Sequence, residues 1–173
     1  MTKSYLAGPV VIAVGLSCGI IAGYAEPVSN EVMIVNAKTG KCVTIAGGTS
    51  TANNVKAVQF DCDRDPSRRW RLSEVSGGTS QVRNVKTGKC LTITGGLSTA
   101  NNVVALQFDC DDHPSRTWQI NDATGNGQHQ LRNVQTSKCL TIAGGTSTAN
   151  NVDAVQFDCD TDQSRRWTIR LKL

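Results

Sequence analysis

An acidic residue and an arginine recur together at three places in the chain, each pair a few residues beyond a phenylalanine. These residues are Phe60, Asp63 and Arg68, then Phe108, Asp111 and Arg116, then Phe157, Asp160 and Arg165. A carboxylate accepts hydrogen bonds and a guanidinium donates them, so together they are complementary to a diol. The alternative is structural, because the two side chains can equally pair with each other and hold their loop. The pattern leaves both interpretations open.

Each cluster also contains groups that could support a ligand. Without residues 1–25 the chain has no Tyr, so Phe60, Phe108 and Phe157 are the candidate flat platforms, unless they fill the core. Asn54, Asn102 and Asn151 could bond a ligand from a neighbouring hairpin, or be present because Asn tolerates positive φ in turns. Both alternatives stay open for each set.

Metal, cofactor and catalytic chemistry have little support. Asp61-x-Asp63-x-Asp65 begins like a calcium loop but lacks the later Gly and Glu, and His113 stands where Asp65 would recur. His113 and His129 each occur in one repeat only and have no matching partner. The many Asp residues lie in short polar loops, unlike the cleft that paired-carboxylate catalysis needs. We therefore predict no metal, no cofactor and no enzyme.

The first 25 residues have the pattern of a signal peptide. A short basic start, an apolar stretch and the small residues of Gly23-Tyr24-Ala25 predict cleavage after Ala25. An uncleaved anchor and a lipoprotein modified at Cys18 are the alternatives. The expected mature chain, residues 26–173, is secreted and has no membrane span. Outside the leader, six Cys remain, and an exported protein can keep them as disulfides.

The strongest feature of the sequence is internal repetition. Cys42, Cys90 and Cys139 begin equivalent segments, which gives a period of 48 and then 49 residues, and Trp70, Trp118 and Trp167 end them. We place the repeats at approximately 31–78, 79–126 and 127–173, in one domain spanning 26–173. If each repeat is one unit, Cys42 pairs with Cys62, and the other two pairs are Cys90 with Cys110 and Cys139 with Cys159.

The elements that would position these residues are short strands. In the first repeat, Val32–Val35, Cys42–Ala46, Ala57–Phe60 and Trp70–Leu72 are apolar stretches separated by turn-forming residues such as Gly47-Gly48. No helical periodicity is visible. This predicts an all-β domain with about four strands per repeat. One repeat cannot bury its own apolar face, so the three should share the core of a closed, pseudo-threefold barrel.

The repeat resembles that of the ricin-B-like, or R-type, lectins. Lys-Cys-Leu-Thr-Ile, the Gly-Gly turn, Phe-Asp-Cys and the final Trp match that family's repeat in order, three times over residues 31–171. The resemblance implies a β-trefoil, a core position for the repeat-ending Trp, and carbohydrate binding. It also aligns Phe60, Phe108 and Phe157 with the aromatic residue that stacks on sugar.

The expected ligands of that family are exchanged in all three repeats. Thr44, Thr92 and Thr141 replace its sugar-binding Asp, and Arg68, Arg116 and Arg165 replace the Gln of its Q-x-W motif. Ser67, Ser115 and Ser164 replace the polar residue before that Gln, often Asn. Three matching exchanges favour a different ligand set over decay of unused sites, although a recent duplication would give the same pattern.

These patterns together predict a secreted, non-catalytic and monomeric lectin, haemagglutinin-like, with up to three sites for galactose- or rhamnose-type pyranoses on glycans or polysaccharides. The alternative is a protein-binding β-trefoil such as a protease inhibitor. The net charge of +4 is spread along the chain without a basic cluster. This argues against nucleic acid as a partner.

Overall fold

The computed structural model describes residues 31–122 and 125–171, which form twelve β-strands and three single-turn 3-10 helices. The predicted signal peptide, residues 1–25, lies outside the described residues. Within the described part of the chain, no helix is long and apolar enough to cross a membrane.

Each repeat contributes four strands and one 3-10 helix. The strands of the first are β1 (Glu31–Asn36), β2 (Cys42–Ile45), β3 (Ala57–Phe60) and β4 (Trp70–Ser76). The second has β5 (Thr79–Asn84), β6 (Cys90–Ile93), β7 (Ala105–Phe108) and β8 (Thr117–Asp122). The third has β9 (Gln128–Asn133), β10 (Cys139–Ile142), β11 (Ala154–Phe157) and β12 (Trp167–Leu171).

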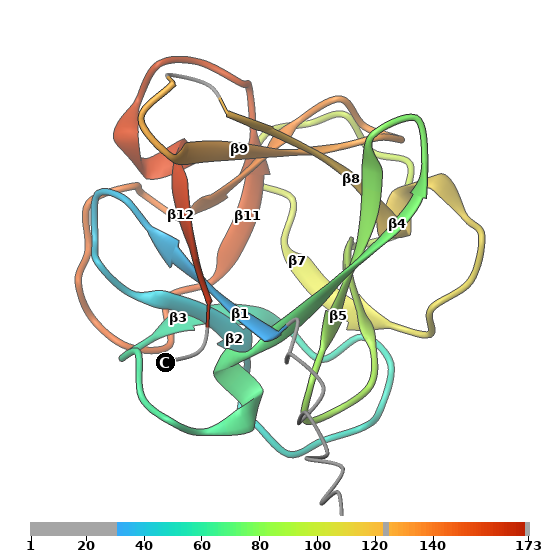
Figure 1. Ribbon diagram of the computed structural model, residues 1–173, viewed down its shortest axis with the longest axis horizontal. Coiled ribbons are helices and arrows are strands. Elements are labelled where there is room, and N and C mark those ends of the chain that lie inside the picture. Colours follow the sequence, from blue (N-terminus) through green and yellow to red (C-terminus); the bar gives the residue numbers. More distant parts are fainter. Residues whose placement is uncertain (1–30, 123–124, 172–173) are drawn as a thin grey trace, which may run out of the picture.

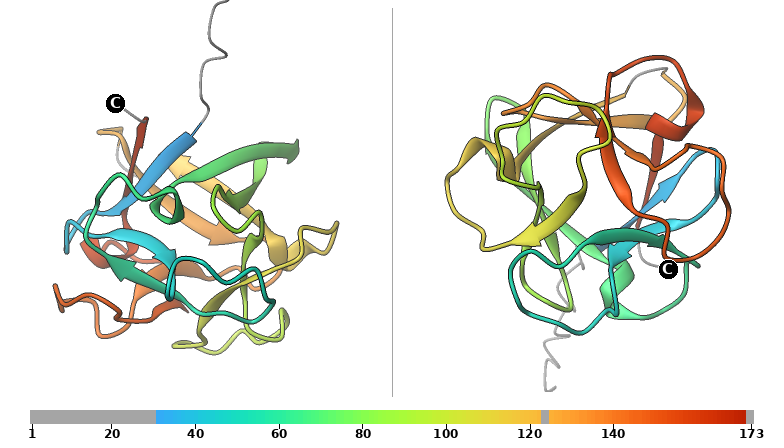
Figure 2. Two further views of the ribbon diagram at one scale, coloured as in Figure 1. Left: turned by 90° about the horizontal axis from the view of Figure 1, so that it is seen from below. Right: turned by 180° about the vertical axis from the view of Figure 1, so that it is seen from behind.

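Six of these strands close a barrel. β1 pairs with β4, β4 with β5, β5 with β8, β8 with β9, β9 with β12, and β12 returns to β1, always antiparallel. Figure 1 shows these strands around the centre of the molecule. The remaining strands form three antiparallel hairpins, β2–β3, β6–β7 and β10–β11. They lie on one side of the barrel in the left view of Figure 2. The fold is the predicted β-trefoil.

The core is shared by the three repeats. Trp70, Trp118 and Trp167 are fully buried, and each donates its indole Nε1–H over 2.9 Å to a carbonyl in its own repeat. Around them lie aliphatic side chains from all three repeats, including Ile34, Leu91 and Leu140. The core position implied for the Trp is confirmed, and no repeat buries these side chains alone.

The six cysteines are paired within repeats, as predicted: Cys42–Cys62, Cys90–Cys110 and Cys139–Cys159. Each bridge joins the first strand of a hairpin to the loop after its second strand. It therefore ties the Asp- and Arg-containing loop to the hairpin that carries the Phe.

That loop ends in the single-turn helices η1 (Pro66–Arg68), η2 (Pro114–Arg116) and η3 (Gln163–Arg165). The periodicity of the sequence does not reveal them, because one turn is too short to repeat a pattern. Each helix places its last residue, an arginine, beside the hairpin. The buried Ser at its centre lies against the preceding Gly-Gly turn.

Candidate functional site

Three equivalent pockets lie between the hairpins and the 3-10 helices. Each is lined by the same types of residue from one repeat: the Thr two residues after the first Cys, the Gly-Gly turn, the Phe and the Arg. A left-handed Asn comes from the repeat before it, the third repeat counting as the one before the first. The volumes are about 300, 330 and 420 Å³ in repeats one, two and three. They define the first, second and third pockets, hollows of small-molecule size.

The phenylalanines line these pockets and do not fill the core. Phe60, Phe108 and Phe157 are each half-buried, and each ends a hairpin strand opposite the first Cys of its repeat. Their exposed surface contributes to the pocket wall.

The arginine lies over the ring of the phenylalanine. The guanidinium carbon Cζ is 4.4 Å from the ring centroid in Arg68–Phe60, 4.5 Å in Arg116–Phe108 and 4.3 Å in Arg165–Phe157. This stacking stabilises the guanidinium, because the face of an aromatic ring attracts a cation electrostatically. One face of each ring is therefore covered by a cation, and the arginine takes over part of the platform that the sequence assigned to the Phe alone.

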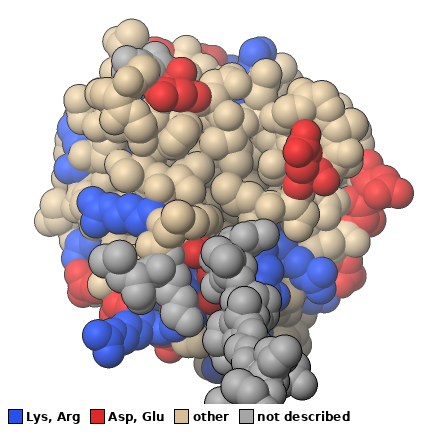
Figure 3. All heavy atoms as spheres, viewed as in Figure 1, with Lys and Arg blue, Asp and Glu red and all other residues tan. Residues whose placement is uncertain are grey.

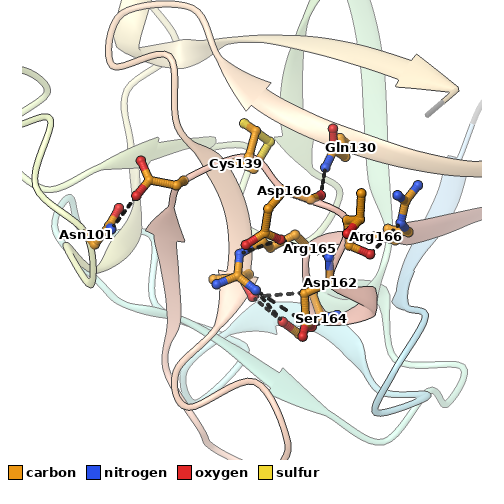
Figure 4. Close-up of polar contacts among 12 residues, drawn as sticks. Asn101, Gln130, Cys139, Asp160, Asp162, Ser164, Arg165 and Arg166 are labelled. Atoms are coloured by element: carbon orange, nitrogen blue, oxygen red, sulfur yellow. Dashed lines mark hydrogen bonds and ion pairs between the residues drawn. A yellow bond between two sulfur atoms is a disulfide. The ribbon is translucent and has the colours of Figure 1, made fainter.

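Each arginine also pairs with the acid predicted to act with it. The Nε atom is 3.4 Å from Oδ1 of Asp63 in Arg68, 3.1 Å from Asp111 in Arg116 and 3.4 Å from Asp160 in Arg165. Figure 4 shows Asp160, Asp162 and Ser164 around Arg165 in the third repeat. The Asp and Arg side chains therefore pair with each other, which is the structural alternative that the sequence left open. The arginine side chains are only 11–13% exposed.

The three acids of these pairs do not line the pockets. Asp63, Asp111 and Asp160 approach the guanidinium from its Nε edge, and none of them is among the residues that form the pocket walls. They lie at the Nε edge of the guanidinium, and each also accepts the backbone N–H of the residue two positions later in its loop. Their role there is to orient the guanidinium.

The threonines line the pockets with their hydroxyls already bonded. Thr44 Oγ1 donates to the backbone carbonyl of Ser67 at 2.8 Å, and Thr92 and Thr141 make the same bond to Ser115 and Ser164 at 2.9 Å. All three side chains are buried. Thr therefore replaces a carboxylate acceptor of the family with a group that ties the strand to the 3-10 helix.

The residue before each 3-10 helix explains the calcium-like pattern. Asp65 and Asp162 cap η1 and η3 by accepting the backbone N–H of Ser67 and Ser164 at 2.8 Å. These N–H bonds hold the pKa of both carboxyls below its usual value. His113 does the same for η2, with Nδ1 accepting from Ser115 N. His can replace Asp here because the position requires an acceptor for a backbone N–H.

The asparagines have the positive φ that was one of the two reasons given for their presence in turns, and each of them also lines a pocket. Asn54, Asn102 and Asn151 have φ of 66°, 63° and 64°. The backbone N–H of Asn54 donates to Gln107 O in the second repeat, so its side chain lines the second pocket rather than the first. By the same relation, Asn102 lines the third pocket and Asn151 the first. The sequence predicts that each Asn reaches a site from a neighbouring hairpin but does not show which repeat's pocket it lines.

The glycines of the Gly-Gly turns are wall residues that the sequence analysis treated only as turn formers. Gly48, Gly96 and Gly145 have positive φ, and a Cβ on any of them would lie 3.0 Å from the Oγ of the buried Ser in η1, η2 or η3. The recurrence of two adjacent glycines in each repeat was the available signal. Their second function depends on a contact about 20 residues away in the chain, between Gly48 and Ser67 in the first repeat.

A further hollow, of about 400 Å³, lies beside the first repeat. Within the second repeat, Gln81 donates to the carbonyl of Asp111 over 2.7 Å. Within the third, Gln130 donates to the carbonyl of Asp160 over the same distance. Met33 occupies the equivalent position and cannot donate this bond, and it lines the hollow together with Arg64 and Arg170.

The family can be decided at this point. The sequence profile described as "Ricin-type beta-trefoil lectin domain-like" matches residues 24–108, 73–156 and 114–172. The chain belongs to the ricin-type β-trefoil lectins. The threefold pockets of this ricin-type lectin domain thus lie where each repeat presents its Phe, Gly-Gly turn and Arg.

Solved structures share the fold. A designed threefold-symmetric protein, ThreeFoil, has a TM-score of 0.78 and 19% identity over 83% of this chain and 99% of its own. An exo-beta-1,3-galactanase from Clostridium thermocellum has a TM-score of 0.78 and 23% identity, over 84% of this chain and 31% of its own. The Macrolepiota procera ricin B-like lectin, in complex with lactose, has a TM-score of 0.69 and 17% identity over 82% and 95%. No curated protein sequence matches this ricin-type lectin domain.

Proposed function

We propose that this protein is a secreted, non-catalytic lectin that binds carbohydrate through the three equivalent pockets. The observation that carries the proposal is the threefold recurrence of one pocket, with the same Thr, Ile, Gly-Gly, Phe, Arg and Asn in each wall, in a member of the ricin-type β-trefoil lectins. Membership of that family supports a carbohydrate-binding role, and the pocket residues supply its chemistry.

A pyranose ring would find an apolar wall and fixed polar groups in each pocket. In the first pocket, the wall is Phe60 with Ile45, and the polar groups are the Arg68 guanidinium and the side chain of Asn151. Sugar sites combine these two kinds of group because a pyranose has apolar C–H faces and a rim of hydroxyls. The stacked arginine is held by Phe60 and Asp63, so it needs little reordering on binding.

Three weak sites on one rigid monomer suit a multivalent ligand. A surface or polymer that carries many copies of the sugar would engage more than one pocket at once, and the avidity would exceed the affinity of each site. This supports a haemagglutinin-like cross-linking role. The face seen in Figure 3 mixes acidic and basic side chains without separating them by sign, which does not favour a nucleic-acid surface.

The proposal is tested with a glycan array probed with the purified protein under non-reducing conditions. Binding to one coherent class of glycan, competed by the free monosaccharide, is the expected result. The combined variant Phe60→Ala, Phe108→Ala, Phe157→Ala should lose this binding while keeping its far-UV circular dichroism spectrum. A silent array with correctly folded protein would reject carbohydrate binding and would favour a protein partner, such as a protease.

A further inference from the structure

The charged residues that line the three pockets are mostly cationic. Among the described residues, Arg68 is the one charged side chain in the wall of the first pocket, and Arg116 is the one of fixed charge in the second, beside His113. The third pocket is lined by Arg165 and Lys38 against a single carboxylate, Asp162. Each pocket wall therefore presents a guanidinium to a ligand, while the acid paired with it lies at the Nε edge, outside the wall.

The arginines are oriented so that the far end of the guanidinium is available. Nε faces Asp63, Asp111 or Asp160, and Nη1 donates to the adjacent Ser, for example to Ser115 Oγ at 2.7 Å from Arg116. No hydrogen bond in the described part of the chain uses the Nη2 atom of these three arginines. The stacked ring and the acid behind it fix the plane of the guanidinium.

We propose that the three pockets select saccharides that carry a carboxylate, such as uronic acids, with the arginine as the anchoring residue. This inference rests on the proposed lectin function and names its ligand class. A planar guanidinium with free N–H groups matches a carboxylate, and such charge-assisted bonds are about twice as strong as neutral ones. Because the arginine side chains are only 11–13% exposed, water screens the interaction less than at an open surface.

The exchanges in the sequence agree with this ligand class. A neutral sugar presents many O–H donors, and a carboxylate on the protein can accept their hydrogen bonds. In this chain, Thr44, Thr92 and Thr141 stand where the family has that Asp. Each Thr hydroxyl donates its hydrogen to a backbone carbonyl. The pocket gains a cation where the family has a neutral Gln. The ligand class therefore differs from the neutral galactose- or rhamnose-type sugars expected from the sequence.

The decisive experiment compares three ligands that differ only at one carbon of the sugar. Binding of D-galacturonic acid, of its methyl ester and of D-galactose is measured by isothermal titration calorimetry or saturation-transfer NMR at pH 7. We expect the acid to bind at least about tenfold more tightly than the ester or galactose, the ratio that one charge-assisted hydrogen bond can supply. Glucuronic acid and N-acetylneuraminic acid then show which carboxylate-bearing sugar fits best.

The variants locate the preference. Arg68→Gln, Arg116→Gln and Arg165→Gln combined should abolish the discrimination between acid and ester, whereas Arg83→Gln, an exposed arginine outside the pockets, should retain it. If the triple variant does not fold, Arg116→Lys, which keeps the charge but loses the planar fork, should weaken binding at the second pocket. Equal binding of galactose and galacturonic acid would overturn the proposed ligand class and leave the lectin function standing. Failure of every saccharide would overturn both.

Discussion

The side-chain amide of Asn53, in the first repeat, donates to the carboxylate of Asp109, in the second, over 2.7 Å. Asn101 makes the same bond to Asp158 at 2.8 Å, and Asn150 closes the circle to Asp61 at 2.7 Å. Each Asp also pairs with a Lys of its own repeat. The loop after each Gly-Gly turn is thereby fastened to the next repeat, which is how an Asn of one repeat reaches the pocket of another.

Beneath this ring, a buried glutamine secures the same loop. The side-chain amide nitrogen of Gln107 donates to the carbonyls of Ser50 and Ala52 at 2.7 Å, and its oxygen accepts from Thr87. Gln107→Leu should lower the free energy of unfolding by about 1–3 kcal/mol, because buried polar groups are left unpaired. Chemical denaturation measures this loss. Asn53→Ala, which removes a bond near the surface, is the comparison, and an equal loss in both variants would contradict the assignment.

Each disulfide closes a loop of the same size, because the paired cysteines are 20 positions apart in sequence. In the loop-entropy description, removing one bridge by a double Cys→Ala change should cost about 3 kcal/mol. We expect the three double variants, at Cys42/Cys62, Cys90/Cys110 and Cys139/Cys159, to lose similar stability in thermal unfolding. A much larger loss at one bridge would show that the repeats do not contribute equally.

The stability of the fold should fall in acid. Hydrogen bonds from Asn150, Asn53 and Asn101, then from the paired Lys, hold the pKa of Asp61, Asp109 and Asp158 below the usual value of 3.8. A carboxyl whose pKa is lowered by folding stabilises the native state above its unfolded pKa. That contribution is lost as the pH falls through the native pKa, because protonation then favours the unfolded chain.

The measurement is the free energy of unfolding at pH 7 and at pH values below 3.8, the usual carboxyl value in Asp. The triple variant Asn53→Ala, Asn101→Ala, Asn150→Ala removes the first cause of the three shifts. Its stability should therefore depend less on pH across this range than that of the wild type. Parallel profiles for the two proteins would show that these bonds do not control the acid response.

Two adjacent glycines allow a matched test of the pocket wall. Gly47 and Gly48 both have positive φ, +71° and +68°, but only a Cβ at Gly48 meets a neighbour, Ser67 Oγ at 3.0 Å. Gly47→Ala should therefore cost only the backbone strain, roughly 1 kcal/mol. Gly48→Ala should cost more, because Ser67 and the Thr44 bond to it must shift. Thermal unfolding of the two variants compares them, and equal melting temperatures would reject the contact as a constraint.

The repeats, the strands, the disulfide pairing and the types of residue at the candidate site could all be predicted from the amino-acid sequence. This was possible because these properties are local or recur in register: the Cys spacing, the apolar stretches and the Gly-Gly turns are repeated three times. The shared, closed barrel followed from the repeats, because one repeat cannot bury its own core. The family resemblance then specified a β-trefoil. The short 3-10 helices were not predicted, because a single helical turn is too short to show a hydrophobic periodicity.

Only the tertiary structure decided how the site residues meet. The position of Asn54 in the second pocket depends on the backbone bond to Gln107, a contact between repeats. The choice between Phe60 in the core and Phe60 at the pocket depended on how the β2–β3 hairpin, in which Phe60 pairs with Cys42, packs on the rest of the fold. Whether Asp63 faces a ligand or Arg68 is a competition between two favourable partners. In the folded chain, Asp63 lies 3.4 Å from Arg68 Nε, because the disulfide-tied loop between β3 and η1 sets this position.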